Sequence, residues 1–116
     1  MSDIKRIDIS SRMSQVVIHE NKLFTAGIVA SDPNTDVAAQ TGQILDTIDG
    51  YLAASGSDKS KILTANIWLS SIKHYEEMNE VWDTWVDESN PPVRACVESR
   101  LASPKYKIEI QISAVI

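Results

Sequence analysis

Arg94 and Glu109 are the two charged residues whose positions most clearly suggest chemistry. Arg94 follows Pro91 and Pro92, which stop a helix, and it opens a run that alternates like a strand. A guanidinium held at the start of a strand can bind a carboxylate through two parallel hydrogen bonds. Glu109 follows fifteen positions later in another alternating run. The spacing alone favours an ordinary ion pair between neighbouring strands, and a carboxylate-binding site is the alternative.

The other reactive side chains give weaker indications of a site. Cys96 could act as a nucleophile if Arg94 lowered its pKa, but free cysteines are commonly buried, so a small core residue is the favoured interpretation. His19 and His74 are far apart in the sequence, and neither has a second ligand at close spacing. No glycine-rich loop joins a strand to a helix. The sequence therefore predicts no metal site and no cofactor.

Three short strands and a helix are expected in the first half of the chain. Residues 4–9 and 15–19 are typical of strands, and a tight turn over 20–22 leads into a third strand that ends on Gly27. Thr35 or Asp36 can cap a helix that Gly56 ends. The apolar positions of this helix fall at helical spacing, at Val37, Thr41, Ile44, Leu45, Ile48 and Leu52.

The second half is expected to add a strand, a helix and two final strands. The apolar run 62–69 is typical of a strand covered on both faces, by helices on one side and by a neighbouring subunit on the other. A helical stripe follows at Tyr75, Met78, Val81, Trp82 and Trp85. Strands over 94–98 and 107–112 complete an α+β order of β-β-β-α-β-α-β-β.

Alternation within the last two strands assigns their side chains to faces. Arg94, Cys96 and Glu98 share one face of their strand, and Glu109 and Gln111 share one face of theirs. The isoleucines between them are expected to pack on the helices. The Glu109 face is therefore expected to meet water, a ligand or a subunit interface.

Composition limits the class of protein. The 116 residues are expected to form a single domain over 1–116, and a chain this short commonly buries a further face against another subunit. A net charge of −5 without a lysine or arginine cluster argues against nucleic acid as a partner. No run is apolar enough to span a membrane, and the N-terminus lacks the apolar core of a signal peptide. With Cys96 as the single cysteine, we expect a cytoplasmic protein.

Five segments follow one another over nearly the whole chain: 12–17, 23–27, 78–82, 92–98 and 107–110. Together, and in this order, they resemble the RidA/YjgF family, the reactive intermediate (enamine/imine) deaminases. The most specific part is the last third, where Arg94, Cys96 and Glu109 keep the family's separation without a gap.

The resemblance implies a chorismate-mutase-like fold, with a mixed sheet backed by two helices, assembled as a homotrimer with a ligand cleft at each subunit interface. It also implies hydrolysis of 2-imino acids to 2-oxo acids and ammonia, without a cofactor. Arg94 would hold the substrate carboxylate, and Glu109 would position the attacking water. The backbone around Gly27 and Cys96 would contact the imine end, and Asn79 would lie near the cleft.

Two residues depart from the family pattern. Met13 stands where the best-known subgroup has a tyrosine, and Ala26 stands where it has a serine just before the glycine. Both changes remove hydroxyls from the pocket, which shifts the preferred substrate and can reduce turnover. The alternative function is a non-catalytic trimeric module that binds small 2-oxo acids or other carboxylates as a sensor or regulator. An endoribonuclease is a minor alternative, disfavoured by the acidic charge and the absence of a suitable histidine pair.

Overall fold

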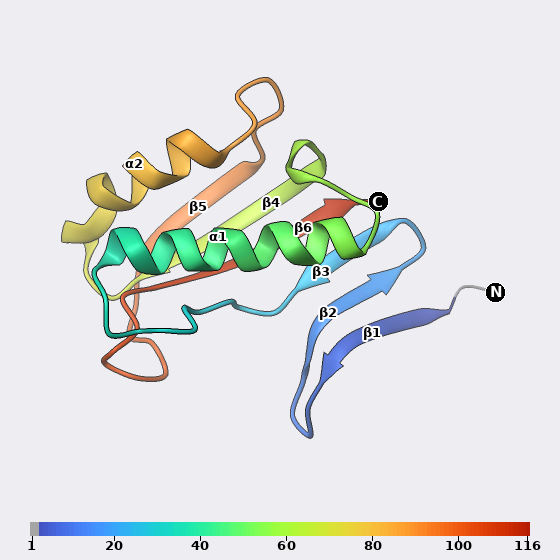
Figure 1. Cartoon of the computed structure of the whole chain (residues 1–116), viewed down its shortest axis with the longest axis horizontal. Coiled ribbons are helices and arrows are strands. Elements are labelled where there is room, and N and C mark those ends of the chain that lie inside the picture. Colours follow the sequence, from blue (N-terminus) through green and yellow to red (C-terminus); the bar gives the residue numbers. More distant parts are fainter. Residues whose placement is uncertain (1–2) are drawn as a thin grey trace.

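A mixed sheet of six strands, with two helices packed on one of its faces, forms the architecture of the computed structural model (Figure 1). The structure describes residues 3–116. The strands are β1 (Ile4–Ile9), β2 (Ser14–His19), β3 (Lys22–Thr25), β4 (Ile62–Leu69), β5 (Val93–Glu98) and β6 (Ile108–Val115). The helices are α1 (Val37–Ala54) and α2 (Tyr75–Trp85), with short 3₁₀ turns at Lys59–Lys61 and Ile72–His74.

The spatial order of the strands is β1-β2-β3-β6-β4-β5. The first three strands form an antiparallel meander, and Glu20 adopts a φ of 58° in the tight turn that joins β2 to β3. β6 pairs antiparallel with both β3 and β4. β5 pairs parallel with β4 and forms one edge of the sheet. The last strand of the chain therefore lies inside the sheet, and β5 is separated from it by β4.

Local signals explain where α1 begins and ends. The Asp36 carboxylate accepts a hydrogen bond of 2.8 Å from the backbone N–H of Ala39, which satisfies one free donor of the first turn. The helix ends at Ala54, and Gly56 follows with a φ of +78°, a conformation that suits glycine. Asp36, one of the two expected caps, is thus the residue that caps the helix.

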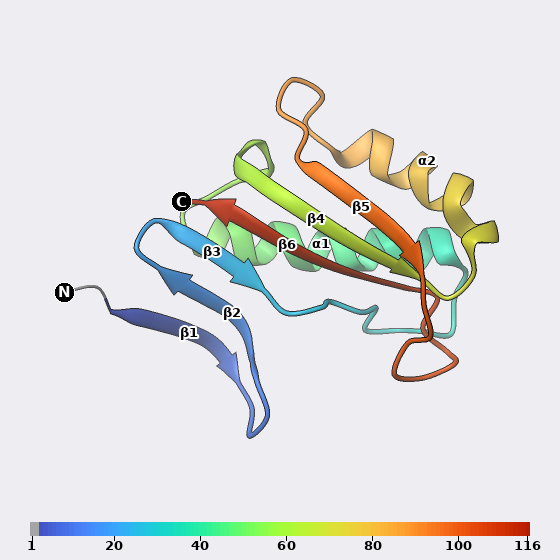
Figure 2. The same cartoon turned by 180° about the vertical axis from the view of Figure 1, so that it is seen from behind.

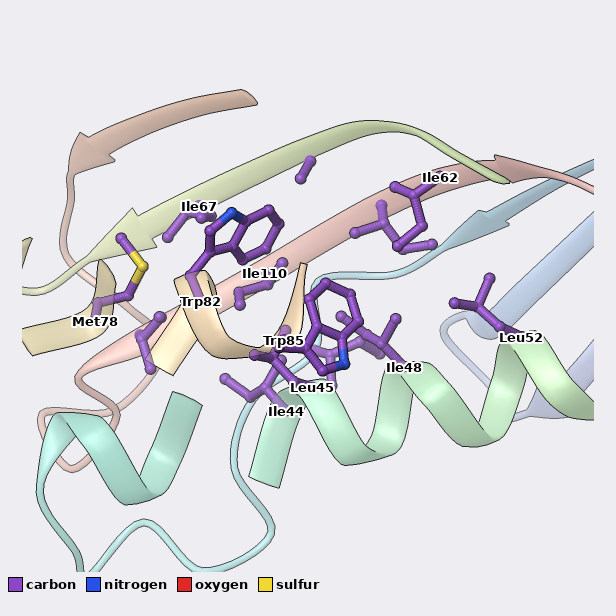
Figure 3. Packing of buried hydrophobic residues seen from close by; sticks show 14 of the residues in the cluster. Ile44, Leu45, Ile48, Leu52, Ile62, Ile67, Met78, Trp82, Trp85 and Ile110 are labelled. Carbon is purple, nitrogen blue, oxygen red and sulfur yellow. The ribbon is translucent and has the colours of Figure 1, made fainter. Parts of the chain in front are cut away.

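The main core lies between the helices and the sheet (Figure 3). α1 contributes Ile44, Leu45, Ile48 and Leu52, which the structure buries almost completely. From α2 come Met78, Trp82 and Trp85. The two indole rings lie 5.3 Å apart, and Trp85 Nε1 donates a hydrogen bond of 2.9 Å to Asp49 of α1. This bond lets a large apolar ring be buried without leaving its N–H unsatisfied.

The opposite face of the sheet carries no helix (Figure 2). Ile108, Ile110 and Ile112 point to the helices as predicted, and the alternate residues of β6 are only half-buried. Large apolar side chains remain open on this second face, including Phe24 at 47% exposure and Val93 at 70%. We expected β4 to be covered on both faces. Within one chain, helices cover only one of them.

The predicted α+β class and the element order are confirmed. Two strand ends differ from the prediction. β3 stops at Thr25 because the Thr25 hydroxyl accepts a hydrogen bond from the backbone N–H of Ile112, which interrupts the ladder before Gly27. β6 runs to Val115, because its last residues pair with Leu23 and Lys22. In the part of the chain that the structure describes, no helix is long and apolar enough to cross a membrane.

Candidate functional site

Arg94 lies near the start of β5 and points to the helix side of the sheet. Its Nη1 donates a hydrogen bond of 2.8 Å to Asn79 Oδ1, and its Nη2 donates one of 3.2 Å to the Tyr75 hydroxyl. The guanidinium carbon also lies 5.4 Å from the centre of the Trp82 ring. These contacts fix the orientation of a long side chain that would otherwise sample many rotamers.

The three partners of Arg94 come from one face of α2. Tyr75, Asn79 and Trp82 are spaced by four and three residues, so they follow one another along the helix. Asn79 was expected near the site from the sequence. Tyr75 and Trp82 were assigned to the core, and their helical spacing with Asn79 was the signal that could have placed them beside Arg94.

Arg94 has no acidic partner in the described part of the chain. Among residues 3–116, no carboxylate lies within ion-pair distance of its guanidinium. Two hydrogen bonds to neutral groups leave the other N–H groups of the fork available. The side chain is therefore oriented by the protein but retains donors for an external anion.

Glu109 lies on the opposite, helix-free side of the sheet, against Gly27. A Cβ added at Gly27 would collide with the Glu109 carboxylate, so a larger residue here would displace this flexible side chain from its position. The segment is held in place by Ile28, whose N–H and carbonyl bond to Ile110 at 2.8 and 3.0 Å. The structure thus brings together Gly27 and Glu109, which the family resemblance assigned to one site.

The Glu109 carboxylate lines a cavity of about 550 Å³. We call this space the Glu109 cavity; its lining residues are Met13, Gln15, Gly27, Ile28, Val29, Ser31, Thr47, Ala102, Tyr106 and Glu109. Among them, Glu109 supplies the only acidic group. Desolvation by the surrounding residues raises the pKa of Glu109 above its usual value. A carboxylate of this kind is a stronger base than a free glutamate, which suits a role in proton transfer.

The predicted ion pair between Arg94 and Glu109 is wrong. The prediction placed them on neighbouring strands, but β4 lies between β5 and β6. Arg94 pairs in register with the buried Ala65, whereas Glu109 pairs with Trp68, so the two charged side chains emerge on opposite faces. Within one chain they cannot bind the same small molecule.

Cys96 behaves as the small, partly buried residue that was predicted. It lies on the helix side of β5 with Arg94 and packs against the core. Desolvation raises the pKa of its thiol, and the nearby positive charge of Arg94 opposes that shift without overcoming it. The thiolate is therefore disfavoured, which argues against a nucleophilic role.

The residues that depart from the family pattern lie close to Glu109. Met13 lines the Glu109 cavity and is 45% exposed. Ala26 directly precedes Gly27, and its N–H donates a hydrogen bond of 2.8 Å to the Gln15 carbonyl. No group of three or more potential metal ligands occurs among the described residues.

Comparisons with known proteins agree with this arrangement of elements and residues. The sequence profile of the family described as "Endoribonuclease L-PSP" matches residues 3–116. A RutC family protein from Haemophilus ducreyi is 47% identical over 113 residues, which cover 97% of each chain.

Two solved structures share the fold over almost the whole chain. A protein from Pseudomonas aeruginosa superposes with a TM-score of 0.95 at 35% identity, covering 97% of this chain and 98% of that one. A member of the YjgF protein family from Neisseria meningitidis gives a TM-score of 0.92 at 44% identity, covering 97% and 94%. The profile match, the RutC family relative and the shared fold lead to one conclusion: the chain belongs to the RidA/YjgF family.

Proposed function

We propose that the protein hydrolyses reactive 2-imino acids to 2-oxo acids and ammonia in a cleft between subunits of a homotrimer. The observation that carries the proposal is the division of the site: Arg94 is oriented without an acidic partner on one face, and Glu109 lines a cavity on the other. Two copies of the chain can bring the Arg94 of one subunit to the Glu109 of another. The site is then incomplete in a monomer.

Each half of the divided site has a distinct task in this reaction. The Arg94 guanidinium binds the substrate carboxylate and fixes the position of the adjacent C=N carbon. Glu109 accepts a proton from water as the water oxygen bonds to that carbon and the π electrons move to nitrogen. Glu109 then returns the proton to nitrogen, and the resulting carbinolamine loses ammonia as the C=O bond forms and its hydroxyl proton passes to solvent water, which leaves the 2-oxo acid.

The reaction needs little beyond this positioning. A protonated imine carbon is already electrophilic, so the protein has to fix the substrate, orient one water and exchange one proton. The raised pKa of Glu109 suits both directions of that exchange. We propose that the protein acts in the cytoplasm, where the single Cys96 would stay reduced.

A coupled assay tests the proposed activity directly. An amino acid oxidase generates a panel of 2-imino acids, and the appearance of each 2-oxo acid is followed with and without the protein. We expect faster conversion of at least one imino acid, with a rate proportional to the protein concentration. Unchanged rates across the panel, with folded protein, would contradict the proposal.

The second candidate is a trimeric module that binds 2-oxo acids or related carboxylates without turnover. Met13 in the Glu109 cavity, together with Ala26 beside Gly27, favours it, because both positions lack a hydroxyl that could assist catalysis. Calorimetric titration with 2-oxo acids separates the candidates, since this one predicts saturable binding in a protein that shows no hydrolysis. The ribonuclease named in the family description remains a minor candidate, because the chain is acidic and neither His19 nor His74 lines the Glu109 cavity.

A further inference from the structure

A second cavity, separate from Arg94 and Glu109, lies where the end of β4 meets the loop between β5 and β6. It measures about 430 Å³ and has one cationic residue in its lining. We call it the Arg100 pocket; it is lined by Ser70, Arg100, Leu101, Ser103, Pro104 and Tyr106. Tyr106 is the one residue that it shares with the lining of the Glu109 cavity.

Backbone hydrogen bonds hold the two walls of the Arg100 pocket together. The N–H of Ser70 donates to the Lys107 carbonyl at 3.0 Å, and the N–H of Ser99 donates to the Leu69 carbonyl at 2.9 Å. Within the loop, the N–H of Tyr106 donates to the Ser103 carbonyl at 3.2 Å. The backbone of the fold therefore determines the shape of the pocket.

The charge around the Arg100 pocket is opposite to that of the chain. Segments 70–74 and 99–107 contain Lys73, Arg100, Lys105 and Lys107 and no aspartate or glutamate, although the net charge of the chain is −5. Glu98 adjoins the second segment, but its carboxylate already accepts a hydrogen bond of 2.9 Å from the N–H of Ile72. The two segments therefore carry more positive charge than the chain as a whole, which favours an anionic ligand beside Arg100.

Several donors of the pocket have no partner in the protein. Among residues 3–116, nothing forms a hydrogen bond or ion pair with the Arg100 guanidinium, the Ser70 hydroxyl or the Tyr106 hydroxyl. The Ser103 oxygen accepts from the N–H of Lys105 at 3.3 Å, which leaves its own hydrogen free to donate. One guanidinium fork and three hydroxyls thus line the same space.

We propose that the Arg100 pocket binds a phosphate monoester or inorganic phosphate. A phosphoryl group near neutral pH carries up to two negative charges and offers at least three acceptor oxygens, which matches the fork and the hydroxyls. A carboxylate has two oxygens and one charge, so it would use fewer of these donors. Leu101 and Pro104 add an apolar wall for the organic part of a monoester.

Nuclear magnetic resonance titration of the full-length protein tests the site. Isotope-labelled protein is titrated with inorganic phosphate, with a simple alkyl phosphate and with acetate, in a phosphate-free buffer at constant ionic strength. Both phosphates should cause saturable shifts of backbone amides in 70–74 and 99–107, with acetate at least about tenfold weaker there. Tighter binding of the alkyl phosphate than of inorganic phosphate identifies the monoester as the preferred source, and the reverse identifies the free ion.

Matched variants distinguish a built site from general charge attraction. Arg100→Ala should weaken phosphate binding by about tenfold or more, and Tyr106→Phe should weaken it less, because it removes one neutral donor. Arg6→Ala is the control, because Arg6 is an exposed arginine of β1 and its loss changes the net charge equally. Equal weakening by Arg100→Ala and Arg6→Ala, unsaturable shifts, or acetate binding as tightly as phosphate would each overturn the proposal.

Discussion

Arg94 is oriented by neutral groups before any substrate arrives. Asn79 and Tyr75 accept its hydrogen bonds, and no acid in residues 3–116 neutralises it. We expect Arg94→Ala to reduce kcat/KM for imine hydrolysis by about a hundredfold or more, because substrate positioning and charge pairing are both lost. The free energy of unfolding should change by only about 1 kcal/mol, because no buried carboxylate loses its partner. Steady-state kinetics and urea denaturation measure the two effects.

Two further variants sharpen the Arg94 assignment. Arg94→Lys keeps the charge but loses the planar fork, so it should remain strongly impaired. Cys96→Ala is the control on the same face of β5, and its rate should stay within about tenfold of the original because the thiol takes no part. Full activity of Arg94→Ala would contradict the role assigned to Arg94. A large loss of activity in a stable Cys96→Ala protein would show that the thiol takes part in the reaction.

We expect the Glu109 carboxylate to lower the stability of the folded protein at pH 7 while it serves imine hydrolysis. Its pKa is raised by burial, so its charged form is less favourable in the folded chain than in the unfolded one. As pH rises through this raised pKa, the folded state loses stability relative to the unfolded state. Glu109→Gln should therefore melt at a higher temperature than the original protein at pH 7 while losing imine hydrolysis.

The pH dependence separates this effect from a change in packing. The difference in melting temperature should disappear below the ordinary pKa of a glutamate, where the carboxyl group is protonated in both states. Glu80→Gln, on the exposed side of α2, is the matched control and should give a smaller difference at pH 7. A Glu109→Gln protein less stable than the original at pH 7 would contradict the assigned effect of burial.

Gln40 connects α1 to the segments that flank the Glu109 cavity. This fully buried residue donates from Nε2 to the carbonyls of Pro33, Thr35 and Lys105, and its Oε1 accepts from the N–H of Lys107. Gln40→Ala would leave these backbone groups without a partner. We expect a loss of about 3 kcal/mol in the free energy of unfolding, measured by denaturation at a fixed protein concentration.

Gln43 provides a control on the same helix. Gln43 is only partly buried, and it bonds to a neighbouring loop through the N–H and carbonyl of Asp32, in exposed hydrogen bonds that water can replace. Gln43→Ala should therefore cost less than about 1 kcal/mol. Similar losses in the free energy of unfolding for Gln40→Ala and Gln43→Ala would contradict the expectation that burial makes the Gln40 hydrogen bonds more important.

The sequence predicted the helices and strands themselves more accurately than it predicted which strands lie side by side in the sheet. Helical spacing, Asp36 and Gly56 defined α1, and alternation assigned Arg94 and Glu109 correctly to faces of their own strands. Alternation does not show which strands are adjacent, because the alternating pattern of a strand is the same whichever strand it pairs with. The insertion of β6 between β3 and β4 depends on burial of its whole isoleucine row, and it separates the two charged residues.

The helix-free face of the sheet exposes large apolar side chains that a second subunit could cover. Phe24, Val93 and Val97 remain about half exposed or more on one side of the sheet, and β5 leaves one edge unpaired. We predict a homotrimer, which would cover this face and join the two halves of the site. Light scattering should give about three times the chain mass of 12.8 kDa. A monodisperse, active monomer would rule out the divided site.

The position of β6 also governs how the chain can be made. β3 can pair with β2, and β4 with β5, but the two halves of the sheet cannot join until Ile108–Val115 has been synthesised, because β6 lies between β3 and β4. During translation, the N-terminal meander and α1 must wait with their apolar faces exposed, and folding cannot be completed segment by segment as the chain leaves the ribosome. A stop codon before residue 108 would therefore release a chain unable to close its sheet.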